Sequence, residues 1–380
     1  MLIQIKEFLK IYLYDAINFA INPTKKFTPK TIFLLRLDAI GDYILFRNFI
    51  EIFKNNSQYK DYKITLVGNI AWKDLAENLD KKFIDEFIWI DIRKFHRNLV
   101  YRYKKLKEIT RKGYEIVIHP TYSRTLDTDF IVKLVNAKEK IGNSGDRSNI
   151  RAWQKEVTDC YYTKLLAAKK GILFEFHRNK EFFENLLGEK IEIKKPYINF
   201  LDSNLSFKLP EEFVFLFIGA GEPFRKWPIE KYVKIGEYIY NKYNLQIVLC
   251  GGVSDVEDGY KFESLSNYPI INLVGKIKLI DLIKIINRSK LVISNETSVP
   301  HITVALNLPV VVISNGNHFG RFTPYPSEIT DKYYAIYPPE IESNLKKFEQ
   351  LVDLYGMGSR LDISKIEVDR VIKCVDLILK

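Results

Sequence analysis

Two cations behind a glycine-containing turn are the first feature of this 380-residue sequence that could perform chemistry. Gly219 and Gly221 follow an apolar run, Arg225 and Lys226 come directly after them, and Pro228 suits the first turn of a helix. The glycines leave room for a ligand, and the two cations could neutralise a diphosphate. The alternative is an ordinary surface turn that packs a tryptophan.

A second segment combines hydroxyl, carboxylate and imidazole groups at the start of a predicted helix. Glu296, Thr297 and Ser298 follow a predicted strand, and the chain then enters a helix at Pro300, with His301 next. Free N–H groups at a helix start can bind phosphate without side-chain help, and the three polar side chains could hold a ribose or another sugar. A plain capped turn with His301 packed on the helix is the alternative.

A third segment places one carboxylate behind a tight turn. Arg36 ends an apolar run, Gly41 allows the turn, and Asp42 then stands at a helix N-terminus. Asp42 could act as a general base, or it could simply cap the helix. A fourth loop, residues 315–326, contains two glycines and two prolines together with His318 and Arg321. These two residues, with Arg36 and Gly41, are candidate loop or acceptor contacts.

Other chemistries find little support. The sequence has no G-x-x-x-x-G-K-[ST] phosphate loop, no G-x-S-x-G elbow and no H-E-x-x-H pair. The turn at Gly219 and Gly221 lacks the third glycine of a dinucleotide fingerprint, which argues against NAD. Asp127 and Asp129 have the D-x-D spacing of a metal–nucleotide site, but the start of a helix explains them better. We therefore expect no metal and no cofactor.

The elements that must position these groups alternate between short apolar runs and helical patterns, which predicts two α/β domains in tandem. In such sheets ligands bind at the carboxyl ends of the strands, where all four segments fall. The predicted strands are 31–36, 63–67, 87–90, 116–119, 213–218, 246–250, 291–294 and 309–314, and the predicted helices are 43–54, 100–111, 229–243, 279–288, 300–306 and 364–379. A polar stretch near 190–210 predicts the linker.

Composition limits the partners and the compartment. Fifty-eight Lys and Arg against 47 Asp and Glu give a net charge of +11, which suits a nucleotide, nucleic acid or an acidic membrane surface. The three cysteines are far apart, as expected in a reducing cytosol. An amphipathic helix within residues 1–30 could pack on the adjacent domain or lie on the inner membrane.

The order of these motifs resembles glycosyltransferase family 9, the lipopolysaccharide heptosyltransferase family. The resemblance runs from about residue 31 to 326 and resumes in the C-terminal helix. It is carried by the R-x-x-x-x-G-D opening at Arg36–Asp42, Lys226-Trp227-Pro228, the pair Gly251-Gly252, the Gly275–Leu279 element and Glu296–His301.

The resemblance implies a GT-B fold, with two Rossmann-like domains facing a central crevice and a C-terminal helix packing back on the N-terminal domain. The implied division is an extension at 1–30, an acceptor domain at 31–205, a nucleotide-sugar domain at 206–355 and the helix at 356–380. An anionic glycolipid of the lipopolysaccharide or lipooligosaccharide kind, or another surface glycan, would be the acceptor. The enzyme would work in the cytoplasm, as a peripheral protein on the inner face of the inner membrane if the N-terminal helix binds there.

The resemblance also implies a role for each motif residue. Asp42 would deprotonate the acceptor, Lys226 would hold the donor phosphates, and His301 would support the loop of Glu296, Thr297 and Ser298. Gly219, Gly221, Arg225 and Gly251 would complete the donor site, and Gly41 would shape the turn before the base. ADP-heptose is the expected donor. Glu296 and Ser298 replace the family's usual Asp and Gly and alter the sugar pocket, so a different sugar stays open.

Two other classes remain as alternatives. A nucleotide-sugar epimerase or a dehydrogenase would share the tandem α/β organisation, but it needs a dinucleotide fingerprint after its first strand. A nucleic-acid-binding protein would explain the charge, and the basic run 97–112 is the nearest approach to the stripe that it requires. A solvated helix face, or the side of the acceptor cleft that meets phosphates, explains that run better, so we expect no nucleic acid.

Overall fold

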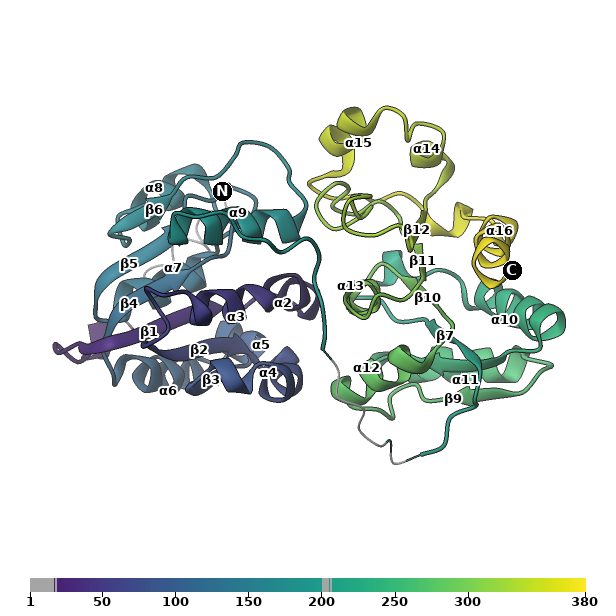
Figure 1. The fold of residues 1–380 in the computed structure, drawn as a ribbon, viewed down its shortest axis with the longest axis horizontal. Helices are drawn as coiled ribbons and strands as arrows, with labels where there is room; N and C mark the ends of the chain where they lie inside the picture. Colours follow the sequence, from purple (N-terminus) through teal and green to yellow (C-terminus); the bar gives the residue numbers. More distant parts are fainter. Residues whose placement is uncertain (1–16, 18, 200–204, 206) are drawn as a thin grey trace. The chain divides into compact units, whose positions relative to one another are not determined.

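The computed structural model describes residues 17, 19–199, 205 and 207–380. They form two compact units, each with its own parallel sheet and helices (Figure 1). Of the described residues, the first unit contains those up to residue 39 together with 49–169 and 178–191, and the second contains those within 40–48, 170–177 and 192–380. Residues 40–48, which include Asp42, thus group with the second unit.

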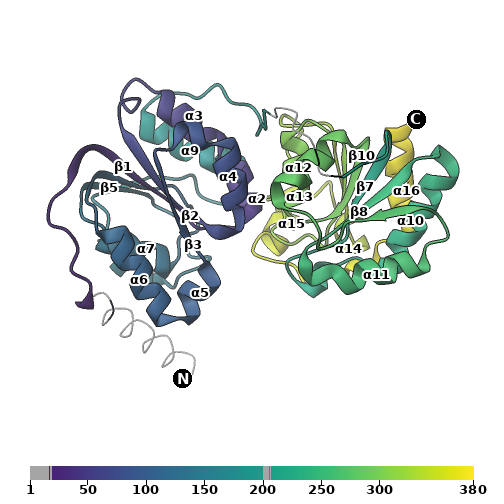
Figure 2. The same cartoon turned by 90° about the horizontal axis from the view of Figure 1, so that it is seen from below.

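The sheet of the first unit is parallel throughout, in the order β3-β2-β1-β4-β5-β6. Its central strands are apolar runs buried on both faces, as parallel sheets require. Helices α3, α4 and α9 cover one face, and α5, α6 and α7 cover the other (Figure 2). The strands are β1 Thr28–Arg36, β2 Lys63–Asn69, β3 Glu86–Ile90, β4 Tyr114–His119, β5 Ala137–Asn143 and β6 Lys164–Leu166. The helices are α3 Asn48–Asn55, α4 Lys73–Leu79, α5 Ile92–Arg97, α6 Leu99–Thr110, α7 Leu126–Leu134, α8 Ala152–Asp159 and α9 Glu175–Leu187, with short 3-10 turns at Ile70–Trp72 and Lys81–Phe83.

The second sheet repeats this plan in the order β12-β11-β10-β7-β8-β9. Helices α12 and α13 lie on one face, and α10 and α16 on the other (Figure 2). The strands are β7 Phe213–Phe217, β8 Gln246–Cys250, β9 Ile270–Asn272, β10 Leu291–Asn295, β11 Val310–Ile313 and β12 Tyr333–Ile336. The helices are α2 Ile40–Phe46, α10 Ile229–Tyr243, α11 Val256–Leu265, α12 Leu279–Arg288, α13 Ser298–Ala305, α14 Pro339–Glu342, α15 Phe348–Tyr355 and α16 Val368–Leu379, with 3-10 turns at Pro223–Arg225, Val253–Asp255 and Ile363–Lys365.

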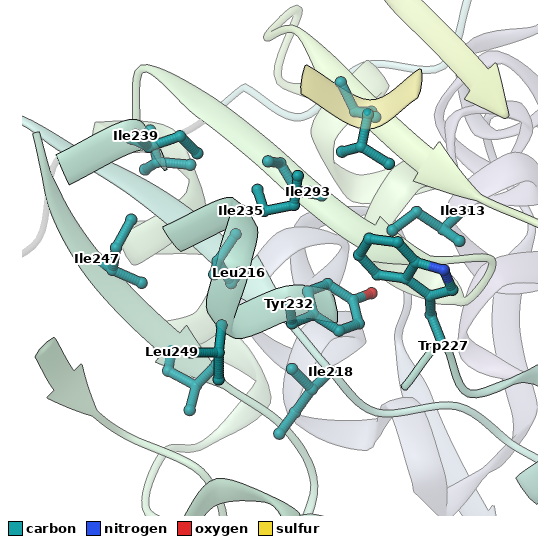
Figure 3. Packing of buried hydrophobic residues seen from close by; sticks show 14 of the residues in the cluster. Leu216, Ile218, Trp227, Tyr232, Ile235, Ile239, Ile247, Leu249, Ile293 and Ile313 are labelled. Carbon is teal, nitrogen blue, oxygen red and sulfur yellow. The ribbon is translucent and has the colours of Figure 1, made fainter. Parts of the chain in front are cut away.

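The core beneath α10 and α16 fixes the loops that follow the strands. Trp227 is 1% exposed within this cluster (Figure 3). Its indole N–H donates to the carbonyl of Ile366 at 3.0 Å. Its backbone N–H donates to Asn295 Oδ1 at 3.1 Å, and the Asn295 amide donates to the carbonyl of Ile218 at 2.8 Å. One buried side chain at the end of β10 therefore holds both ends of the loop that carries Arg225 and Lys226.

Two sequence-based expectations about helices are wrong. The C-terminal helix α16 was expected on the N-terminal domain, but it belongs to the second unit. Val371 and Val375 belong to the core of the second unit, because the apolar face of α16 covers α10, β11 and β12. The helix expected over 43–54 is two helices that divide at Arg47, where the side chains of Arg47 and Asn48 bind the backbone of Tyr197. The expected helix within residues 1–30 lies mainly outside the described residues.

Candidate functional site

The loop after β7 has open space at one of its two glycines. A side chain at Gly221 would meet nothing within 4 Å, whereas one at Gly219 would lie 2.4 Å from Asp255 Oδ2. Gly251, after β8, also faces Asp255, at 3.1 Å from its Cβ. Asp255 Oδ2 in turn accepts a hydrogen bond from the N–H of Gly252 at 2.8 Å. Gly219, Gly251 and Gly252 thus lie around a buried carboxylate at the carboxyl edge of the sheet, and the space beside Gly221 is open.

Lys226 lies directly over that carboxylate. Its ammonium is 2.6 Å from Asp255 Oδ1 and 2.8 Å from Asp258 Oδ2. Burial lowers the pKa of Lys226, but the hydrogen bonds with Asp255 and Asp258 outweigh it and leave the pKa raised. Lys226 is therefore a fully charged cation, and the two carboxylates fix its position. Asp255 and Asp258 were missed from the sequence, although they follow Gly251-Gly252 at helical spacing.

Arg225 points to the end of β10. Its Nη2 donates to the carbonyl of Glu296 at 2.7 Å and to Glu296 Oε1 at 3.1 Å. Glu296 is 5% exposed, and the hydroxyl of Ser314 donates to its other oxygen. Burial raises the pKa of Glu296 in spite of these partners. Ser314 ends the neighbouring strand, and its part in the site could not be read from the sequence.

Thr297 and Ser298 open helix α13, two residues before the expected start at Pro300. Thr297 is the N-cap residue, and its Oγ1 accepts from the N–H of Val299 at 3.2 Å. Ser298 is the first residue of the helix, and both side chains are partly exposed. The N-terminus of α13 thus lies at the same sheet edge as Arg225. Thr297 already binds the N–H of Val299 and Pro300 has no N–H, so the N–H of Ser298 is the donor that the first turn can offer to an anion.

His301 is buried one turn into α13. Its Nδ1 is 2.7 Å from the hydroxyl of Tyr325, and the rings of Tyr325 and Phe322 pack against it. Burial, with a smaller contribution from Arg225, lowers the pKa of His301 to about 3. The imidazole is therefore neutral at pH 7, which suits a structural support rather than an acid.

Helix α2 brings Asp42 to α13. Helices α2 and α13 pack together, and a side chain at Gly41 would meet His301 Cδ2 at 2.9 Å. Asp42 is the next residue, in the first turn of α2, and is partly exposed. The structure thus brings Gly41, Asp42, Ser298 and His301 together where α2 packs on α13.

The remaining candidates are held by other groups. Arg36 is fully buried in the first unit, where its Nε is 2.7 Å from Asp38 and its Nη1 donates to Asn179 at 2.9 Å. Arg321 Nε is 3.1 Å from Glu175. His318 has a positive φ of 55°, and burial and Arg321 lower its pKa. Their roles as acceptor contacts stay predictions.

The D-x-D pair opens a helix, as expected. Asp127 and Asp129 lie in the first turn of α7, where Asp127 pairs with Arg102 and His96 and Asp129 accepts from Tyr162. Across the described part of the chain, no group of three or more His, Cys, Asp or Glu residues could hold a metal ion.

Comparisons with known proteins place these motifs in a family. The profile of Glycosyltransferase family 9 (heptosyltransferase) matches residues 102–356, more than half of the chain. Lipopolysaccharide heptosyltransferase 2 of Salmonella typhimurium is 24% identical over 164 residues, which are 42% of this chain and 46% of that protein. The chain therefore aligns with about half the length of this curated relative.

Solved structures share the fold across almost the whole chain. A family 9 glycosyltransferase from Veillonella parvula has a TM-score of 0.70 at 19% identity, and the alignment covers 94% of this chain and 99% of the Veillonella chain. E. coli heptosyltransferase WaaC with ADP has a TM-score of 0.66 at 14% identity, and the alignment covers 91% of this chain and 99% of WaaC. E. coli ADP-heptose lipopolysaccharide heptosyltransferase II has a TM-score of 0.63 at 16% identity, and the alignment covers 92% of this chain and 98% of that enzyme. With two Rossmann-like units of the GT-B fold and this profile match, the chain belongs to glycosyltransferase family 9.

Proposed function

We propose that this protein is an inverting glycosyltransferase that moves a sugar from a nucleoside-diphosphate sugar to a hydroxyl of a surface glycan. ADP-heptose is the donor and lipopolysaccharide the acceptor that its relatives suggest, since one solved relative is bound to ADP and the curated relative is a lipopolysaccharide heptosyltransferase. The observation that carries the proposal is the convergence of Arg225, Lys226 and the N-terminus of α13 at one sheet edge, with Asp42 packed beside them.

In the proposed reaction Asp42 takes the proton of the acceptor hydroxyl while the oxygen of that hydroxyl bonds to the anomeric carbon of the donor sugar. The bond between that carbon and the diphosphate breaks, and its electron pair leaves with the phosphate oxygen. Negative charge therefore grows on the leaving group in the transition state. Lys226, Arg225 and the α13 N-terminus stabilise this charge, and fixed donors of this kind contribute roughly 3–4 kcal/mol each.

The test uses the full chain with a panel of nucleotide sugars and a purified lipooligosaccharide acceptor. Wild type should release nucleoside diphosphate only with acceptor present, and it should keep this activity in EDTA. Asp42→Asn should bind the nucleotide normally and lower kcat by roughly 10²–10⁴. Wild-type turnover in this variant would show that Asp42 only caps α2.

We also propose that the protein contacts the inner membrane as a peripheral protein, since its acceptor is a glycolipid. No helix among the described residues is long and apolar enough to cross a bilayer. The corner between α5 and α6 supports surface contact instead. Arg93, Lys94 and Arg97 are exposed there, beside Leu99 and Val100, which are 43% and 63% exposed. Cations with adjacent apolar side chains suit an anionic lipid surface.

A further inference from the structure

The two expected phosphate-binding cations already have carboxylate partners. Lys226 pairs with Asp255 and Asp258, and Arg225 pairs with Glu296. A nucleoside-diphosphate sugar is an anion, and its diphosphate gains negative charge when the sugar leaves. When all five groups are ionised, two cations and three carboxylates carry no net positive charge, so Arg225 and Lys226 can offer that ligand hydrogen-bond donors but no surplus charge. The second unit should therefore contribute a further cation at this edge.

Arg360 meets this requirement. Its guanidinium carbon is 4.4 Å from the centre of the Phe224 ring, and Phe224 directly precedes Arg225 in the loop after β7. The residue is exposed. Within the described part of the chain, the Arg360 side chain has no ion pair and no hydrogen bond, in contrast to Arg225 and Lys226.

The backbone beside Arg360 is fixed at the same sheet edge. Ser359 Oγ donates to the carbonyl of Asn315 at 2.6 Å, and the Ser359 N–H donates to Asn317 Oδ1 at 3.2 Å. Asn315 follows directly after Ser314, which binds Glu296. Arg360 is thus one residue from an anchor that connects to the donor loop, and its side chain reaches out over Phe224.

The position of Arg360 over the Phe224 ring is compatible with phosphate binding. A guanidinium on an aromatic ring uses its flat face, whereas its N–H donors lie along the edge of the plane. Two of those donors can bind two phosphate oxygens together. The ring also restricts the side chain, so less rotamer freedom is lost when the ligand binds.

We propose that Arg360, held on Phe224, binds the diphosphate of the donor and is a third cation of the donor site. This inference rests on the proposed function. Arg360 lies beyond residues 102–356, the part that matches the family profile, so the profile does not assign it. As a ligand of the leaving group, it should affect both donor affinity and turnover.

The experiment measures binding of ADP, GDP and UDP, and of the uncharged nucleosides as competitors, to the full chain by calorimetry. Arg360→Gln should weaken binding of the preferred diphosphate roughly tenfold and leave nucleoside binding unchanged. Arg360→Lys, which keeps the charge without the planar fork, should recover part of the affinity. Phe224→Leu should cause a smaller loss than Arg360→Gln. Lys373→Gln removes an exposed cation from α16 and is the matched control.

The outcomes separate the inference from the proposed function. Wild type that binds none of the diphosphates rejects the donor site and Arg360 with it. Normal wild-type binding with affinity in Arg360→Gln within twofold of wild type overturns the role of Arg360 alone. An equal loss for the nucleoside and the diphosphate would place Arg360 on the base and also overturn the assignment. A selective loss for the diphosphate, with an unchanged Tm, supports it.

Discussion

Gly41 in α2 lies so close to His301 in α13 that a methyl group at Gly41 would approach His301 Cδ2 to 2.9 Å. Real side chains do not approach so closely, so only glycine allows the two helices their observed contact. Asp42 follows Gly41 directly. The glycine of the opening motif thus sets how near the proposed base comes to the start of α13.

Gly41→Ala should therefore separate α2 from α13. We expect a loss of roughly 1–3 kcal/mol in unfolding free energy, because overpacking outweighs the gain in helix propensity. Transfer should slow further than stability alone explains. Urea unfolding and initial rates measure the two effects. Gly221→Ala, whose added methyl meets nothing within 4 Å, is the stability control. Equal stability of Gly41→Ala and wild type would contradict the close contact.

Lys226→Ala should destabilise the fold and weaken nucleotide binding for different reasons. Asp255 is 3% exposed and would lose its partner, so we expect the unfolding free energy to fall by roughly 1–3 kcal/mol. Adding Asp255→Asn should restore stability but not nucleotide affinity. Urea unfolding and calorimetry with a nucleoside diphosphate separate the effects. Lys261→Ala, which removes the cation of an exposed pair with Glu230, is the control. It should lower the unfolding free energy by no more than about 0.5 kcal/mol. If the double variant recovers nucleotide affinity together with stability, the pair of Lys226 and Asp255 has only a structural role.

The sequence predicted the strands and the positions of the site loops better than the contacts within the site. The bounds of α10, β8 and α12 agree with the expected ranges, because apolar periodicity and flanking glycines are local signals. The partners of Lys226 and Arg225 are not local: Asp255 and Asp258 come from the turn and helix after β8, and Glu296 comes from the segment after β10. Arg360 is farther along the chain and carries no motif, so only the folded sheet brings it to Phe224.

The buried His301 should make the protein sensitive to acid. Its pKa is about 3 in the folded chain, against about 6.5 when unfolded, so between these values the unfolded state binds the extra proton. Stability is then lost as pH falls below about 6.5, by up to about 1.4 kcal/mol per pH unit. His301→Gln should flatten this slope in urea unfolding between pH 7 and 5. His119, whose pKa burial and Arg124 also lower, contributes in the same direction, and His119→Gln measures its share. An unchanged slope in His301→Gln would show that the imidazole accepts protons in the folded state.

The corner between α5 and α6 should carry the affinity for membranes. Replacing Arg93, Lys94 and Arg97 with Gln should weaken sedimentation with anionic liposomes, more at low salt than at high salt, because exposed charges are screened. Removing three exposed cations from the second unit, Lys261, Lys290 and Lys373, is the control of equal charge. An equal loss in both triple variants would indicate net charge rather than a defined surface. Binding to neutral liposomes should be weak throughout.

Glu296→Asp introduces the aspartate that is usual at this position in the family and shortens the side chain by one methylene group. Glu296 reaches Arg225 with one oxygen and Ser314 with the other, and the shorter chain cannot keep both contacts in place. If this end of β10 contacts the donor sugar, the variant should change the ranking of nucleotide sugars more than it changes stability. Transfer from three nucleotide sugars, with urea unfolding in parallel, measures both. Ser314→Ala removes the second contact while keeping Glu296, and should shift the ranking less. An unchanged ranking in Glu296→Asp, with a lowered unfolding free energy, would restrict Glu296 to holding Arg225.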